Sequence, residues 1–265
     1  NEELNAFIKN IINFIKNEQM FNDFDYSNIL IQIKYDIFDE VKFYLLNKLK
    51  QYRKCLELFI EPNSHINDRI KRLFEWIKDI HKGLINNEKG MTMFKNDIIN
   101  NIKKIADVDI NQFESMVKEI FPEEKKKILE KLLSEDKAIC LKYIEVLVKF
   151  INDNLNNEEE MDKIKQDSES TSFILELHIK LLCEFEKKEE ILTALEKNHL
   201  YPYEQCMKLC QENKVYDAII YLYQINGALI YAVDICINRI DEAFKQFLED
   251  VQESKIGRAS CRERV

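Results

Sequence analysis

The stretch that decides the fold runs from Thr171 to Phe247 and continues to residue 251. It divides into six segments: TSFILELHIKLLCEF (171–185), KEEILTALEKN (188–198), YPYEQCMKLCQEN (201–213), VYDAIIYLYQI (215–225), GALIYAVDICIN (227–238) and RIDEAFKQFLEDV (239–251). In each segment apolar residues recur three and four positions apart, which is the period of an amphipathic helix. Helices of about three turns bury too little surface to be stable alone, so they must stack on their neighbours. The stretch therefore predicts an α-solenoid of short antiparallel helix hairpins.

The composition of the whole chain favours the same all-α fold class. Its 265 residues include only 4 glycines and 3 prolines, while 33% are charged and 46% are hydrophobic. So little glycine and proline leaves few residues suited to the tight turns of a β-protein. We expect an all-α chain with a substantial buried core.

The charge and the cysteines exclude several classes of protein. The formal net charge is −9, and lysines alternate with acids instead of forming a basic stripe, which argues against nucleic acid as a partner. Seven cysteines are spread along the chain without paired spacing. We interpret them as free thiols in a reducing, cytoplasmic compartment. No run of apolar residues approaches the ~18 that a membrane span requires.

Residues 1–151 are predicted to form an N-terminal helical solenoid portion. The apolar periodicity predicts helices over the ranges 4–15, 27–49, 55–60, 66–80, 91–105, 110–121, 123–133 and 139–151. No segment of residues 1–151 has the alternation of apolar and polar residues that is typical of a strand.

Local signals place several of these helix ends. Ser27, Asp109 and Ser134 are expected N-caps, because their short side chains can accept hydrogen bonds from first-turn N–H groups. Pro122 suits the first turn of the helix that follows it. The helix over 55–60 should end at Glu61, since the residue before a proline is displaced from the α region.

Two segments differ from the helical remainder. Residues 152–170 are polar, acidic and poor in apolar side chains, so we expect a flexible loop or a partly helical linker between stacked units. Residues 171–254 form the helical repeat. The last eleven residues, KIGRASCRERV (255–265), contain three arginines and resemble the translation of a sequencing adapter. We interpret 255–265 as a non-native tail, and we expect the natural protein to continue beyond Ser254.

The pair Cys206 and Cys210 is the nearest approach to a metal site. The two thiols lie one helical turn apart, with His199 and Cys183 close in sequence, and zinc takes Cys and His ligands. Structural zinc sites usually carry two tight C-x2-C pairs, and this chain has none. We favour packing of both cysteines in the core.

Other motifs of catalysis and binding are missing from the sequence. There is no HExxH, no G-x-S-x-G, no P-loop and no dinucleotide fingerprint. Four histidines are assigned structural roles: His65, His81, His178 and His199. The acidic runs 158–160 and 123–124 lack the pattern of a calcium loop and are interpreted as solvated faces. Trp76 is expected to pack between helices. We predict a protein that is not an enzyme, with no catalytic, cofactor-binding or metal-binding residues.

Three phrases between Phe173 and Phe247 carry a resemblance to a known family: ELHIKLLCEFE (176–186), ILTALEKN (191–198) and YEQCMKLCQENKVYDAIIYLYQINGALIYAVDICINRI (203–240). They resemble the clathrin-heavy-chain-type repeat of vacuolar protein sorting tethering subunits. Residues 215–218 (VYDA) fill the middle phrase of the repeat, and Gly227-Ala228 fills its turn. The order of phrases is most similar to subunits of the endosomal CORVET complex. The chain departs from the family at Asn226, where Gly-Asp is usual.

The resemblance implies a non-enzymatic scaffold in vesicle-mediated transport. Its partners would be other tethering-complex subunits and an endosomal Rab GTPase, and it would associate peripherally with endosomal or vacuolar membranes through them. Two alternatives remain open. One is a helical-repeat adaptor of another pathway, although the ~34-residue period of TPR arrays is not found. The other is the helical part of a ubiquitin ligase whose zinc module lies downstream.

Overall fold

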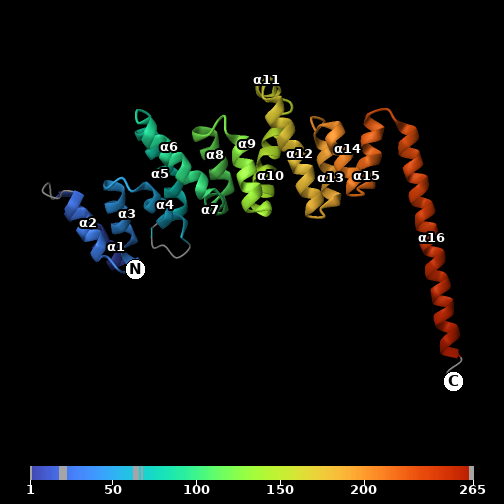
Figure 1. Ribbon diagram of the computed structural model, residues 1–265, viewed down its shortest axis with the longest axis horizontal. Helices are drawn as coiled ribbons and strands as arrows, with labels where there is room; N and C mark the ends of the chain where they lie inside the picture. Colours follow the sequence, from blue (N-terminus) through green and yellow to red (C-terminus); the bar gives the residue numbers. More distant parts are fainter. Residues whose placement is uncertain (1, 18–22, 62–65, 67, 263–265) are drawn as a thin grey trace. The chain divides into compact units, whose positions relative to one another are not determined.

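The computed structural model describes residues 2–17, 23–61, 66 and 68–262 (Figure 1). Within these ranges the chain forms sixteen α-helices and one 3-10 helix, and no strand. The structure is 83% helical, and the helices contact their neighbours in the chain. The predicted all-α helical-repeat fold is confirmed.

The chain separates into two compact units, residues 1–147 and 148–265. The first unit contains the following elements: α1 Glu2–Asn17, α2 Asp23–Gln32, η1 Asp36–Phe38, α3 Asp39–Lys48, α4 Tyr52–Ile60, α5 Arg69–Gly83, α6 Glu88–Asn100, α7 Ile102–Val108, α8 Ile110–Ile120 and α9 Lys125–Glu135. The boundary lies inside α10 (Lys137–Asp153), a few residues before the predicted end of the first portion at residue 151.

In the first unit each helix packs on helices close to it in sequence. The first three helices share a small core built on Ile8, Ile15, Val41 and Leu45. Helix α4 then contacts α3, α5, α6 and α7, while α5 contacts α8 and α7 contacts α9. Contacts mainly between near neighbours are the arrangement of a helical-repeat protein.

The second unit repeats this arrangement. It contains α11 Glu158–Gln166, α12 Ser168–Glu184, α13 Lys188–Lys197, α14 Tyr203–Glu212, α15 Tyr216–Ile225 and α16 Leu229–Arg262. Helix α12 contacts α13 and α14, α15 contacts α13 and α14, and α16 packs on α15 (Figure 1). The four helices predicted between residues 171 and 225 are therefore confirmed.

One type of turn recurs at four helix ends and explains how a chain with few glycines makes these hairpins. The second residue after the helix has a positive φ at Lys50 (55°), Glu186 (57°), Lys214 (54°) and Gly227 (74°). The next N–H then bonds back five residues, for example from Val215 to the Cys210 carbonyl at 2.9 Å. This is the Schellman motif, which usually places glycine at the left-handed position. Three of the four turns use a charged residue there instead.

In three segments the sequence predicts the wrong number of helices. The helix expected from Ser27 to Leu49 is two, α2 and α3, separated by residues 33–38, so Ser27 lies inside α2. The block 91–105 is also two helices, divided at Asn101. The side-chain amide of Asn101 donates to the Asp97 carbonyl at 2.9 Å, and such local bonds compete with the helical ladder. Residues 229–251 belong to one continuous helix, α16, and not to two helices divided after Asn238, since no glycine or proline occurs among them.

Of the other three residues predicted to mark helix starts, Asp109 is confirmed, whereas Ser134 and Pro122 lie elsewhere. Asp109 caps α8 as expected, accepting bonds from the N–H groups of Asn111 and Gln112. The start of α10 is capped by Asp136, which accepts from Ala138 and Ile139, whereas Ser134 lies in the last turn of α9. Pro122 lies in the turn before α9, which begins at Lys125.

The segment 152–170 takes the helical form that the sequence left open. Helix α10 extends to Asp153, α11 covers residues 158–166, and α12 begins at Ser168. Met161 is buried and anchors α11, which contacts α12. Helix α16 includes part of the segment 255–265 that the sequence sets apart.

Candidate functional site

The most prominent surface feature of the second unit is an apolar stripe along α16. Six side chains follow one another at alternating spacings of three and four: Ile230, Val233, Ile237, Ile240, Phe244 and Phe247. All six are exposed; Ile230 is 76% exposed and Phe247 is 60% exposed. This is the a/d spacing of a coiled-coil seam, which predicts that the α16 stripe packs on another helix.

The α16 stripe is distinct from the face by which α16 packs on α15. Ala232 is buried against the unit, and Arg239 pairs with Asp217 at 2.7 Å and lies 5.2 Å from the Tyr216 ring centre. Positions 232 and 239 lie on the same side of the helix, whereas the stripe is centred roughly 120° around the helix from them at 3.6 residues per turn. The C-terminal part of α16 extends past α15 (Figure 1), and residues 240–250 are all exposed.

The first unit contains a cleft between the start of α4 and the helices α5 and α6. We call it the α4–α6 cleft. Its volume is about 710 Å³. Its apolar lining comes from Tyr52, Leu84, Met93 and Phe94. Ligand pockets in proteins range over roughly 300–1,000 Å³ and are mostly apolar. In size and lining the cleft could hold a side chain of a partner.

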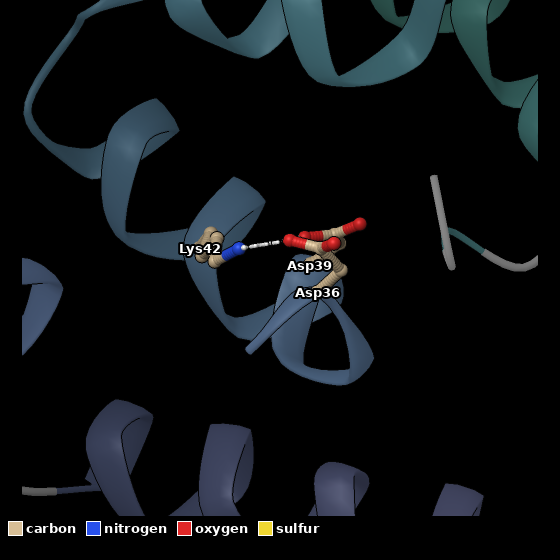
Figure 2. A network of polar contacts seen from close by, with 3 residues as sticks. All are labelled: Asp36, Asp39 and Lys42. Carbon is tan, nitrogen blue, oxygen red and sulfur yellow. Dashed lines mark hydrogen bonds and ion pairs between the residues drawn. The ribbon is translucent and has the colours of Figure 1, made fainter. Parts of the chain in front are cut away.

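A charged network fixes the entry to α3 (Figure 2). The ammonium group of Lys42 lies 3.0 Å from Asp39 Oδ1 and 3.2 Å from Asp36 Oδ1. Burial alone would lower the pKa of Lys42, but the hydrogen bonds to Asp39 and Asp36 outweigh it and raise this pKa. Glu40, also buried, pairs with Arg72 of α5 at 2.5 Å. The network stabilises the packing of α3.

The cysteines considered as zinc ligands are core residues. Cys206 and Cys210 in α14 and Cys183 in α12 are all buried. Burial raises the pKa of Cys206 and of Cys210 to about 12, so both remain neutral thiols near pH 7. In the described part of the chain no group of three or more His, Cys, Asp or Glu side chains could hold a metal ion. His199 is exposed.

The other histidines differ in environment. His178 is buried in α12, and burial lowers its pKa to about 4. His81 is half-buried at the end of α5, and burial lowers its pKa too. His65 lies outside the described residues. A neutral, buried His178 hydrogen-bonded to Tyr201 is consistent with the structural role assigned to it.

Trp76 packs between helices, as predicted. Its ring contacts those of Phe43, Phe59 and Phe94, with centroids 5.5–6.0 Å apart. Its indole N–H donates to Asn47 Oδ1 at 3.1 Å. Phe94 and Tyr52 of the same cluster also line the α4–α6 cleft, so this aromatic core forms the wall of the cleft.

The acidic runs lie at helix starts. Glu158, Glu159 and Glu160 occupy the first turn of α11, where they complement the helix dipole. Glu160 also pairs with Lys163 at 2.5 Å. Glu124 lies between Lys127 at 3.3 Å and Lys95 at 3.8 Å. These contacts are those of solvated faces, as expected.

Sequence reasoning missed both surfaces. The α16 stripe was visible as periodicity, but a buried and an exposed stripe have the same pattern. The cleft unites residues 50–54 with residues 83–97, and no local motif signals that contact.

Comparisons with protein-family models, with curated proteins and with solved structures found no match for this chain. No helix in the described ranges combines the length and apolarity needed to cross a membrane. The assignment of the fold class therefore rests on the structure alone.

Proposed function

We propose that this chain is a non-enzymatic scaffold in endosomal or vacuolar vesicle tethering, and that it binds other proteins through the faces of its helices. The observation that carries the proposal is the α16 stripe. Exposed apolar side chains at coiled-coil spacing serve to bind another helix, because leaving them in water costs roughly 25 cal/mol per Å² of apolar surface.

The trafficking assignment rests on the phrases between Phe173 and Phe247, which resemble the repeat of vacuolar protein sorting subunits. Among these, their order is most similar to vacuolar protein sorting-associated protein 8 of the CORVET complex. The partners would be other tethering subunits and an endosomal Rab GTPase. The chain would lie in the cytoplasm, peripheral on the membrane through these partners.

The test is co-elution of the chain with each tethering-complex subunit of the same source, expressed together and separated by size-exclusion chromatography. We expect stable co-elution with at least one subunit. Phe244→Asp and Phe247→Asp should abolish it, because each places a charge at the C-terminal end of the stripe, where the two largest apolar side chains lie.

Lys245→Gln is the matched control. It makes the same change of one negative unit on the same helix, but away from the stripe, and should leave co-elution intact. Co-elution with no tethering subunit would refute the trafficking proposal and favour the adaptor of another pathway. Co-elution that survives both aspartate variants would refute the role of the stripe.

A further inference from the structure

We infer that the α4–α6 cleft binds an acidic peptide segment carrying one aliphatic or aromatic anchor side chain. The cleft is built entirely from residues 50–97 of the first unit. The inference does not rest on the trafficking proposal or on the α16 stripe.

The apolar part of the cleft fits an anchor side chain. Phe94 is almost fully buried and meets the Tyr52 ring edge to face, with centroids 5.8 Å apart. Leu84 is buried beside them, while Met93 at the rim is 61% exposed. An exposed methionine beside an apolar wall adapts its shape to different partners. This part of the cleft would bury one large apolar side chain of a ligand.

The charges around the cleft select an acidic ligand. Lys50, Arg53 and Lys54 line it, against the single acid Asp97. Arg53 is held by Glu57 at 3.1 Å, whereas among the described contacts Lys50 and Lys54 form no ion pair. The chain as a whole carries a net charge of −9, so a locally cationic cleft departs from its surroundings. Complementary charge steers a partner and sets its specificity.

The polar backbone at the start of α4 fits the main chain of a peptide. The helical ladder begins with the Cys55 N–H, which donates to the Gln51 carbonyl at 3.2 Å, and Gln51 provides no side-chain cap. The N–H groups before Cys55 therefore have no bond within the helix, and helix starts attract carboxylates. Gln51 also lines the cleft, and its buried side-chain oxygen lacks a hydrogen-bond partner.

The experiment measures binding of fluorescently labelled nonapeptides to the full 265-residue chain by anisotropy. One peptide set has a central Phe or Leu flanked by Asp and Glu. A second set replaces the acids by Lys, and a third replaces the anchor by Ser. We expect the acidic anchored set to bind, the other two to bind at least about tenfold more weakly, and affinity to fall with added salt.

Two variants connect binding to the cleft. Gly83 lines it, and a Cβ atom built there meets nothing within 4 Å, so Gly83→Met fills the cleft without a clash. Gly83 ends α5, where a side chain favours the helix over glycine, so the fold should be retained. Lys54→Glu reverses one charge of the rim. We expect each variant to weaken binding about tenfold. Lys104→Glu, at an exposed position of α7 away from the cleft, should have no effect.

Several outcomes would overturn the inference. One is the absence of binding by every acidic peptide up to about 1 mM. Another is unchanged binding by Gly83→Met with retained helicity in circular dichroism. A third is competition by inorganic phosphate that is complete and independent of the anchor, which would reduce the cleft to an anion site. None of these results bears on co-elution with tethering subunits, so the two proposals fail separately.

Discussion

The Nδ1 atom of His178 lies 2.7 Å from the hydroxyl oxygen of Tyr201, and the two rings stack with centroids 6.2 Å apart. This buried pair joins α12 to the turn before α14. Burial lowers the pKa of His178 from 6.5 to about 4. The unfolded chain therefore binds a proton between these pH values that the folded chain does not, and the folded state loses stability as the pH falls.

We predict that the free energy of unfolding falls by roughly 3 kcal/mol through His178 as the pH drops from 6.5 to 4, at 1.36 kcal/mol for each pKa unit. His178→Phe should remove this part of the pH dependence. The measurement is urea unfolding at several pH values, followed by circular dichroism. His199→Gln, at an exposed position, is the control. Equal pH profiles for wild type and His178→Phe would contradict the prediction.

The left-handed turns offer a gain in stability. Lys214 has a φ of 54°, a conformation that costs an L-residue with a side chain roughly 1–2 kcal/mol. We expect Lys214→Gly and Glu186→Gly each to stabilise the chain by about 0.5–1 kcal/mol, because the relief of strain exceeds the added entropy of the unfolded state. Lys208→Gly, inside α14, should instead destabilise by about 1 kcal/mol. Thermal unfolding of the three variants compares them directly, and a loss of stability in both turn variants would refute the argument.

Helix type was predictable in this chain because it depends on a local period. The turns, the helix breaks and the cleft could not be predicted, because they depend on single side-chain contacts or on contacts between residues distant in the sequence. Glycine marks the turn at Gly227, but a lysine at position 214 gives no such signal. The break at Asn101 depends on one side-chain bond, and the continuity of α16 depends on a missing breaker. The α4–α6 cleft depends on how α4, α5 and α6 meet, and no local pattern encodes that.

A buried hydrogen bond between α8 and α10 gives a further prediction. The Tyr143 hydroxyl donates to Glu114 Oε2 at 2.5 Å, and both residues are buried. Tyr143→Phe would leave a buried carboxylate with one partner fewer, at a cost of about 1–3 kcal/mol. Trp76, the single tryptophan, is buried in the same unit and reports its unfolding by fluorescence. Tyr52→Phe, at a half-buried residue, should cost less; equal losses for both variants would argue against the Glu114 bond.

The network of Figure 2 can be dissected by a double-mutant cycle. The side chain of Asp39 is 4% exposed and lies 3.0 Å from Lys42. Lys42→Met removes the cation from a buried carboxylate, so we expect a loss of about 1–3 kcal/mol. Combining it with Asp39→Asn removes the buried charge as well, and the double variant should recover part of the loss. Because hydrogen bonds to both aspartates raise the pKa of Lys42, its contribution is complete below pH 10.5 and is lost as the pH rises through the folded value. Urea unfolding followed by Trp76 fluorescence measures all four proteins, and strictly additive losses would show that the two residues are not coupled.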